Sequence, residues 1–266
     1  MATLEVNGAT VGYAVEGPEH GVPLLLFHGT TMDRTAWDMV RAALPDDTYR
    51  FVMIEFPGSG ESSMPCADAP LTIDRCVTQA LTLMTHLRHE RFHVAGYSLG
   101  AVAALATAAA ARERTASVTS LCGWATSDAR QRITFGLWQR LIATDPELFM
   151  RYALADGFTV NGLTVVEPML DAFLAMGATQ VAPGSHAQLD LDMVLDITAQ
   201  LASITAPCLI IGGLEDRWVD ISHSRSLHEQ IGGSTLHELP AGHLLIQELA
   251  AEVAALLHEQ VTAAAA

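Results

Sequence analysis

The chain has 266 residues, of which 50% are hydrophobic, and its formal net charge at pH 7 is −16. The hydrophobic fraction excludes a wholly disordered chain, and the length suits one α/β domain with an insertion. Because so acidic a surface repels phosphate groups and anionic lipid, we expect neither nucleic acid nor a membrane as a partner.

Apolar strand patterns alternate with helical patterns along most of the chain. Asn7-Gly8 separates two alternating runs, residues 2–6 and 10–16, which predicts an opening β-hairpin. Continuous apolar runs, typical of strands covered on both faces, predict strands at residues 23–27, 50–54, 91–95, 118–123, 208–212 and 235–239. Helices are predicted at residues 37–44, 73–87, 99–112, 220–231 and 247–261. This order favours the α/β class, with a doubly wound, mostly parallel sheet.

The stretch 127–203 has no convincing strand pattern. Its apolar residues recur at helical spacing, and Pro146, Pro168 and Pro183 stand near the expected helix boundaries. We therefore expect a helical cap over the C-terminal ends of the strands, where open α/β sheets bind ligands. The predicted core then has two parts, residues 1–126 and 204–266, on either side of the cap.

The motif Gly96-Tyr97-Ser98-Leu99-Gly100 lies between a predicted strand and a predicted helix. In this setting Gly-x-Ser-x-Gly is typical of a tight turn that presents a nucleophilic serine. The glycines let neighbouring backbone pass closely, and the helix N-terminus directs its partial positive charge at the reacting centre. A plain surface turn is the alternative. We predict that Ser98 is a nucleophile.

A serine nucleophile needs a general base, and the base needs a carboxylate that fixes its tautomer. His243 is the candidate base, because it lies in the loop after the last predicted strand. Asp216 follows the preceding predicted strand and is the candidate acid, although Glu215 and Asp220 compete for that role. The resulting chain order, serine then aspartate then histidine, is associated with one particular fold.

Catalysis also requires hydrogen-bond donors for the negative charge that develops on a carbonyl oxygen. The N–H of Leu99 is one candidate, because this residue follows the nucleophile at the start of a helix. A second donor is expected in the loop after strand 23–27. We expect the N–H of Thr30 to serve, with Thr31 as the second choice, and we expect His28 to orient this loop through hydrogen bonds.

These motifs, in this order, are similar to those of the α/β-hydrolase family, and the chain resembles its small, capped, single-domain serine hydrolases of the esterase and lactonase kind. The resemblance runs through most of the chain and rests on His28-Gly29, residues 55–62, residues 96–100, residues 213–219 and Gly242-His243. Glu55 departs from the family pattern, which usually has Asp at this fold-supporting position. Haloalkane dehalogenases of this fold carry Asp in place of Ser98, so that activity is excluded.

The predicted function is hydrolysis of a carboxylic ester or lactone through an acyl-serine intermediate, with no cofactor and no metal. The apolar cap without basic clusters favours a small, neutral, largely hydrophobic substrate. Candidate substrate contacts are Trp37, Trp138, Phe173 and Trp218. The resemblance leaves thioesterase, carbon–carbon bond hydrolase and elimination chemistry open, and a ligand receptor is an alternative of another class.

The N-terminal residues lack the basic and apolar regions of a signal peptide, and no apolar run is long enough to span a bilayer. The four cysteines, Cys66, Cys76, Cys122 and Cys208, are scattered without metal-ligand spacing. We therefore expect a cytoplasmic protein with reduced thiols. The oligomeric state stays open.

Overall fold

The computed structural model describes residues 2–45, 47–64 and 70–265, so Cys66 lies outside the described part. In the described ranges, eight strands form one sheet in the order β1-β2-β4-β3-β5-β6-β7-β8. The β1–β2 and β2–β4 pairs are antiparallel, and the other pairs are parallel. The strands are β1 (Ala2–Val6), β2 (Ala9–Glu16), β3 (Val22–Phe27), β4 (Tyr49–Ile54), β5 (Phe92–Tyr97), β6 (Thr115–Leu121), β7 (Cys208–Gly213) and β8 (Thr235–Leu239).

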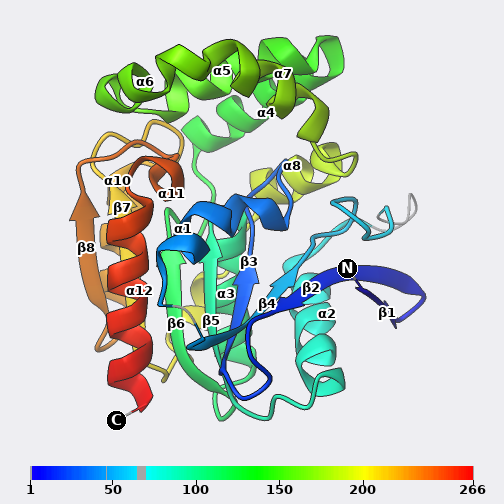
Figure 1. Cartoon of the computed structure of the whole chain (residues 1–266), viewed down its shortest axis with the longest axis vertical. Coiled ribbons are helices and arrows are strands. Elements are labelled where there is room, and N and C mark those ends of the chain that lie inside the picture. The colour runs from blue at the N-terminus through cyan, green and yellow to red at the C-terminus, as the bar shows by residue number, and fades with distance from the viewer. Residues whose placement is uncertain (1, 46, 65–69, 266) are drawn as a thin grey trace.

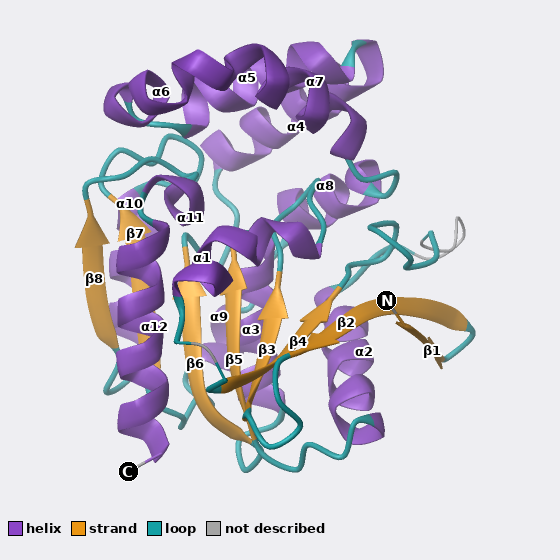
Figure 2. Ribbon diagram, viewed as in Figure 1, coloured by secondary structure: helices purple, strands orange, loops and turns teal. Residues whose placement is uncertain are grey.

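Helices cover both faces of the sheet (Figures 1 and 2). One buried apolar cluster joins the sheet to η1 (Arg34–Trp37), α1 (Asp38–Ala43), α11 (Leu245–Glu248) and α12 (Ala250–Ala265). The other joins the opposite face to α2 (Ile73–His86), α3 (Leu99–Ala110) and α10 (Ile221–Gln230). Every residue of β5, β6 and β7 is buried, which explains why these strands read as continuous runs. The predicted fold class is confirmed.

The residues between β6 and β7, all of them described, form helices and one isolated bridge, between Thr126 and Asp196. Four α-helices lie beyond the C-terminal ends of the parallel strands, at the top of Figure 1: α4 (Ala129–Thr144), α5 (Pro146–Gly157), α6 (Val160–Val166) and α7 (Leu170–Gln180). A 3-10 helix, η2 (Glu167–Met169), joins the last two. Pro146 stands at the first position of α5, where a missing N–H costs nothing.

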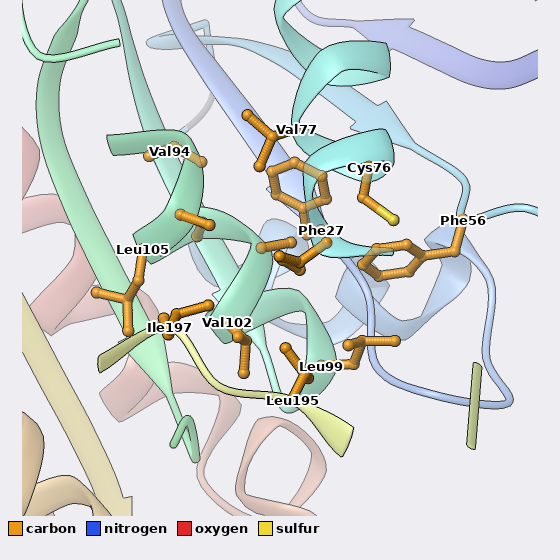
Figure 3. Packing of buried hydrophobic residues seen from close by; sticks show 14 of the residues in the cluster. Phe27, Phe56, Cys76, Val77, Val94, Leu99, Val102, Leu105, Leu195 and Ile197 are labelled. Carbon is orange, nitrogen blue, oxygen red and sulfur yellow. The ribbon is translucent and has the colours of Figure 1, made fainter. Parts of the chain in front are cut away.

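The end of this insertion returns to the core, beside the loops that follow β3 and β4. It forms α8 (Ser185–Val194) and α9 (Thr198–Leu201). Leu195 and Ile197 belong to the same buried cluster as Leu99 and Val102 of α3 (Figure 3). The stretch 127–203 is therefore helical as expected, but its last part packs against the core.

Several boundaries differ from the prediction, among them that of β6, which spans Thr115–Leu121 where the sequence predicts 118–123. β5 continues through Tyr97, so the strand runs directly into Ser98. The helix predicted at 247–261 is two helices, α11 and α12, which divide at Leu249. Because no glycine or proline lies at this division, the sequence carries no signal for it.

Candidate active site

Ser98 lies in the tight turn between β5 and α3. Its backbone angles, φ 57° and ψ −122°, fall in a region that residues with a side chain rarely adopt. Glycine permits the turn at two positions. A Cβ on Gly96 would lie 1.9 Å from the carbonyl oxygen of Gly100, and a Cβ on Gly100 would lie 2.3 Å from that of Phe27. The turn therefore requires the two glycines of the motif.

His243 contacts both other residues of the predicted triad. Its Nε2 lies 3.0 Å from Ser98 Oγ, and its Nδ1 lies 2.7 Å from Asp216 Oδ2. All three residues are at most 6% exposed. A carboxylate beside Nδ1 favours the tautomer that carries its proton there, so Nε2 can accept the proton of the serine hydroxyl. The structure brings these three residues together.

Asp216 is held by the loop that follows β7. Its Oδ1 accepts hydrogen bonds from the N–H groups of Trp218 and Val219, each at 2.9 Å, so both carboxylate oxygens have partners. Glu215 is exposed, and Asp220 accepts a hydrogen bond from Ser222 N at the start of α10. Of the three carboxylates considered, Asp216 is the one in contact with the imidazole.

The loop that carries His243 is held from the core and from the insertion. The Tyr97 hydroxyl donates to the carbonyl oxygen of His243 at 3.0 Å. Glu248 Oε1 accepts from Gly242 N at 2.9 Å and from Thr159 N at 3.2 Å, and Thr159 caps the start of α6. This glutamate therefore connects the histidine loop to the insertion.

Two backbone N–H groups near Ser98 have no acceptor among the described residues. Leu99 begins α3, so its N–H has no intrahelical partner. The N–H of Thr30 likewise has none, whereas the N–H of Thr31 donates to Gln188 Oε1 at 3.0 Å. Both threonines line the same cavity as Ser98, so it is the unbonded N–H that makes Thr30 the better candidate of the two.

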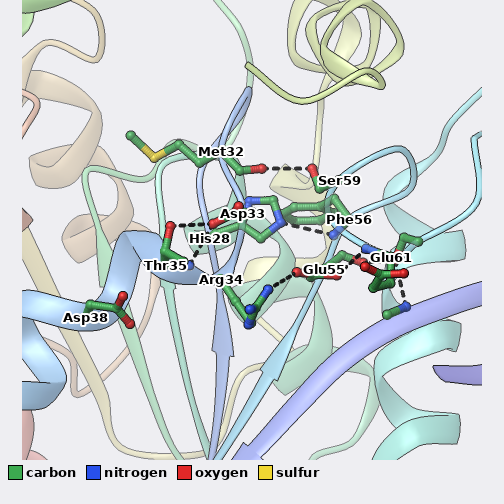
Figure 4. Close-up of polar contacts among 12 residues, drawn as sticks. His28, Met32, Asp33, Arg34, Thr35, Asp38, Glu55, Phe56, Ser59 and Glu61 are labelled. Atoms are coloured by element: carbon green, nitrogen blue, oxygen red, sulfur yellow. Dashed lines mark hydrogen bonds and ion pairs between the residues drawn. The ribbon is translucent and has the colours of Figure 1, made fainter. Parts of the chain in front are cut away.

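His28 bridges the Thr30 loop and the segment after β4 (Figure 4). Its Nδ1 donates to the carbonyl oxygen of Gly29 at 2.7 Å, and its Nε2 accepts from Phe56 N at 3.1 Å. Complete burial lowers the pKa of His28 to about 4, so the ring is neutral at pH 7. Both ring nitrogens are engaged, which suits an orienting role and leaves His28 no part as a general base.

A cavity of about 480 Å³ includes Ser98 and His243 in its wall. Trp138, Phe173 and Trp218, three of the predicted substrate contacts, also line it. Its described lining is mostly apolar and contains two carboxylates, Asp33 and Asp38, but no lysine or arginine. Four methionines add flexible apolar surface: Met32, Met39, Met150 and Met176.

The expectation for Trp37 is wrong. This residue is fully buried in the core, and its indole N–H donates to the carbonyl oxygen of Phe27 at 3.1 Å. Its neighbours Ala36 and Met39 line the cavity instead. The 3-10 turn η1 directs the indole toward the sheet, an orientation that the sequence does not reveal.

Comparison with known proteins agrees with this architecture. Residues 24–256 match the family model described as the alpha/beta hydrolase family. The chain belongs to the alpha/beta hydrolase family. A pyrrolizixenacetamide deacetylase from Xenorhabdus hominickii is 30% identical over 251 residues, which cover 92% of this chain and 91% of the relative.

Solved structures of hydrolases superpose on nearly the whole chain. A hydrolase from Pseudomonas aeruginosa has a TM-score of 0.84 and 26% identity, covering 98% of this chain and 97% of that one. The enol-lactonase from Burkholderia xenovorans has a TM-score of 0.86 and 22% identity, covering 98% and 100%, which shows a shared fold. Similarity to named hydrolases over this length supports an enzyme.

Cys122 lies beside Asp216 and His243, with one potential ligand atom from each within 4.8 Å of the others. Burial raises the pKa of the Cys122 thiol well above its usual value, and metal binding needs the thiolate. Asp216 and His243 already hydrogen-bond each other. These three residues are therefore poor metal ligands.

Sequence reasoning missed the side chains that hold the site from outside the motifs. Gln188 and Asp192 lie in α8, and Glu248 lies in α11. Helical periodicity identifies buried positions through apolar residues, so buried polar residues on a helix give no such signal. No helix in the described ranges has the length and hydropathy needed to cross a membrane.

Proposed function

We propose that this protein is a serine hydrolase that cleaves a carboxylic ester or lactone through an acyl-serine intermediate. The observation that carries the proposal is the continuous hydrogen-bond chain from Ser98 through His243 to Asp216 in the wall of an apolar cavity. Serine is a weak nucleophile alone, and this chain supplies the base and the orienting carboxylate that activate it.

In the first half of the reaction, Ser98 Oγ attacks the substrate carbonyl carbon while His243 Nε2 takes the hydroxyl proton. The carbonyl oxygen becomes negative, and the N–H groups of Leu99 and Thr30 donate to it. When the bond to the leaving alcohol breaks, His243 returns the proton to the alcohol oxygen. Asp216 keeps the imidazole in the required tautomer and stabilises the imidazolium.

In the second half, a water molecule attacks the acyl carbon, and His243 Nε2 takes one of its protons. The bond between the acyl carbon and Ser98 Oγ breaks, and His243 protonates the serine oxygen. Carboxylic acid leaves and the free enzyme returns. An ester and one water thus give one acid and one alcohol.

The cavity supports a neutral, largely hydrophobic substrate. Trp138, Phe173 and Trp218 offer broad apolar surfaces, whereas Asp33 and Asp38 bring negative charge to the described lining without any lysine or arginine. An anionic substrate would meet repulsion with no cation to pair with. Neutral esters or lactones fit this lining better than carboxylate-bearing ones.

The decisive experiment compares Ser98→Ala with the parent on short p-nitrophenyl esters. Loss of the nucleophile should lower turnover by roughly 10⁶-fold. Ser226→Ala, a serine on α10, is the matched control and should retain activity. Reaction with a fluorophosphonate followed by mass spectrometry should locate the adduct on Ser98. An unchanged rate in Ser98→Ala would refute the assignment.

A second candidate is amide deacetylation, which the similarity to the Xenorhabdus hominickii deacetylase favours. The same acyl-serine would form, but His243 would have to protonate an amine leaving group. Acetate release from neutral N-acetyl amines, measured beside release from phenyl acetate, distinguishes the two. Faster turnover of the amide than of the ester would favour the deacetylase.

The other chemistries open to this fold differ in the origin of the product oxygen. Hydrolysis in ¹⁸O-labelled water places one labelled oxygen in the acid, whereas elimination places none. A ligand receptor would bind a neutral ligand with little turnover. Multiple turnovers with label in the acid would support the hydrolase, and a single slow turnover would favour the receptor.

A further inference from the structure

The loop that carries the Thr30 N–H is tied to the last part of the insertion. The Thr30 hydroxyl donates to Asp192 Oδ2 at 2.6 Å. The N–H of Thr31 donates to Gln188 Oε1 at 3.0 Å, and its carbonyl oxygen accepts from Ala182 N at 3.0 Å. Two consecutive loop residues are thus bonded to α8 and to the residues just before it.

Gln188 also reaches the next loop residue through Ser59. Its Nε2 donates to Ser59 Oγ at 3.0 Å, and that hydroxyl donates to the carbonyl oxygen of Met32 at 2.8 Å, a bond visible in Figure 4. Glycine permits the approach, because a Cβ on Gly58 would lie 2.4 Å from the Cα of Gly184. The glycine-rich segment after β4 therefore serves to pack α8 against the loop.

The side chains of Gln188 and Asp192 are both fully buried, and burial of Asp192 destabilises the fold. Burial raises the pKa of Asp192 to about 8, so its carboxyl is largely neutral at pH 7. Among the described residues its Oδ1 has no hydrogen-bond partner. A buried polar atom without a partner destabilises a protein by about 1–3 kcal/mol, which an apolar side chain would avoid. Stability alone does not account for an acid here.

The loop itself has an unfavourable conformation. Thr31 has φ 69°, in the left-handed region, which a β-branched residue rarely adopts. Such strain persists where surrounding contacts impose it, and it occurs often at functional sites. Here the contacts with Gln188 and Ala182 engage both backbone groups of Thr31. The preceding N–H, on Thr30, is left as the free donor beside the cavity.

We propose that Asp192 and Gln188 are positioning residues that set the Thr30 N–H as an oxyanion donor, so that α8 controls turnover without touching the substrate. This inference rests on the proposed function, because it assumes an oxyanion beside Ser98. Asp192 fixes Thr30 by accepting a hydrogen bond from the Thr30 hydroxyl, and Gln188 turns the Thr31 N–H away from the cavity. Neither side chain lines the cavity itself.

The test exploits the fact that the Thr30 hydroxyl can be removed while its N–H stays. Thr30→Val keeps the shape but loses the bond to Asp192, and Thr30→Ser restores the hydroxyl. Gln188→Met removes the amide at similar length. Asp190→Asn is the matched control, because this exposed residue of the same helix bonds to Gln139 and not to the loop.

Each variant is assayed for kcat and KM on a neutral p-nitrophenyl ester and for inhibition by an aryl trifluoromethyl ketone, which adds to serine and places an oxyanion in the site. The amount of folded site is counted by the final stoichiometry of fluorophosphonate labelling. Because misplacing a catalytic group by about 1 Å can cost a hundredfold in rate, we expect kcat per labelled site to fall roughly ten- to a hundredfold in Thr30→Val and Gln188→Met.

A positioning role further requires that KM change little, that the ketone bind more weakly by a similar factor, and that Thr30→Ser recover most of the rate. The double variant Thr30→Val/Asp192→Leu should be no slower than either single variant, because both remove the same bond. If Asp192→Leu does not fold, Thr30→Val and Gln188→Met carry the test.

A Thr30→Val protein with parental kcat per labelled site would overturn the positioning role while leaving the hydrolase assignment intact. So would a loss that appears as fewer labelled sites with unchanged kcat, since that is a stability effect. A parent protein that neither turns over esters nor labels at Ser98 would instead overturn the proposed function and this inference with it.

Discussion

The two loops that meet at Ser98 are held in different ways. The loop after β8, which carries His243, is fixed mainly by core residues, including Tyr97 and Glu248 at the end of α11, and by one bond to the insertion, from Leu244 N to the carbonyl oxygen of Gly157. The loop after β3, which carries Thr30, is fixed by side chains of α8 from the insertion. One half of the candidate site, the core half, therefore depends mainly on the core, and the other, the insertion half, depends on α8 of the insertion.

This difference separates two tasks. Proton transfer between Ser98 and His243 requires geometry that the core sheet and its loops supply. Stabilisation of the oxyanion requires a donor whose position depends on the insertion. If the insertion varies among proteins of this fold, proton transfer can be kept while oxyanion stabilisation is adjusted. The largest effects should come from breaking the core half.

The largest expected loss is in His243→Ala. Without the imidazole, Ser98 has no base and the leaving group no acid, so turnover of p-nitrophenyl acetate should fall by about 10⁶-fold. His228→Ala, an exposed histidine of α10, should stay within about twofold of the parent. A His243→Ala protein that retains a tenth of the activity would show that the core half does not supply the base.

Asp216→Asn should cost about 10⁴-fold in kcat, because an amide can donate to Nδ1 and favour the wrong imidazole tautomer. The measurement is steady-state kinetics on the same ester. Glu215→Gln and Asp220→Asn are direct controls, since both carboxylates lie apart from the imidazole. Should either control lose more activity than Asp216→Asn, the carboxylate has been misassigned.

The Ser98 turn and the residues of its core half were predictable from the sequence for a physical reason. Gly96 and Gly100 are required by close backbone contacts, so the motif itself encodes the turn. The predicted strands 208–212 and 235–239 end where Asp216 and His243 begin their loops. Because parallel strands bring their C-terminal ends to one edge, chain order alone brought these residues near Ser98.

The insertion half could not be predicted in the same way. Helical spacing indicated helices in 127–203, but it did not show that α8 turns back to the core. Asp192 and Gln188 are buried polar residues of a helix, and apolar periodicity gives no expectation for the role of such residues. The prediction for Trp37 was wrong for a related reason, because a large aromatic residue near a site can face the core as easily as the cavity.

Glu248→Ala tests the point at which the two halves meet. Its carboxylate accepts hydrogen bonds from Gly242 and Thr159, and bonds to a charged acceptor contribute about 1.5–3 kcal/mol each. We expect the free energy of unfolding in urea to fall by about 3 kcal/mol, the lower end of the range for two such bonds, and kcat to fall roughly tenfold through displacement of His243. Glu252→Ala, exposed on α12, is the matched control. A fall in stability with unchanged kcat would show that this glutamate serves the fold alone.

The buried acid of α8 should make the stability of the protein depend on pH. The folded-state pKa of Asp192 is raised to about 8 from an ordinary value of 3.8, so between these values the folded chain binds the proton that the unfolded chain has lost. The free energy of unfolding contributed by this group therefore falls as pH rises through that window.

The variant Asp192→Asn cannot bind or release this proton. The free energy of unfolding of the variant minus that of the parent should rise by up to about 1.4 kcal/mol per pH unit between pH 5 and 8. A change in stability that the amide causes at every pH does not alter this slope. The thiol of Cys76, which lies near Asp192, has a pKa raised to about 12 by burial and stays protonated throughout. Urea unfolding of both proteins at several pH values gives the slope, and Asp190→Asn, at an exposed position of the same helix, is the matched control. A flat difference for Asp192→Asn would mean that the buried acid is already charged at pH 5, and α8 would then bond to the Thr30 loop through a carboxylate anion.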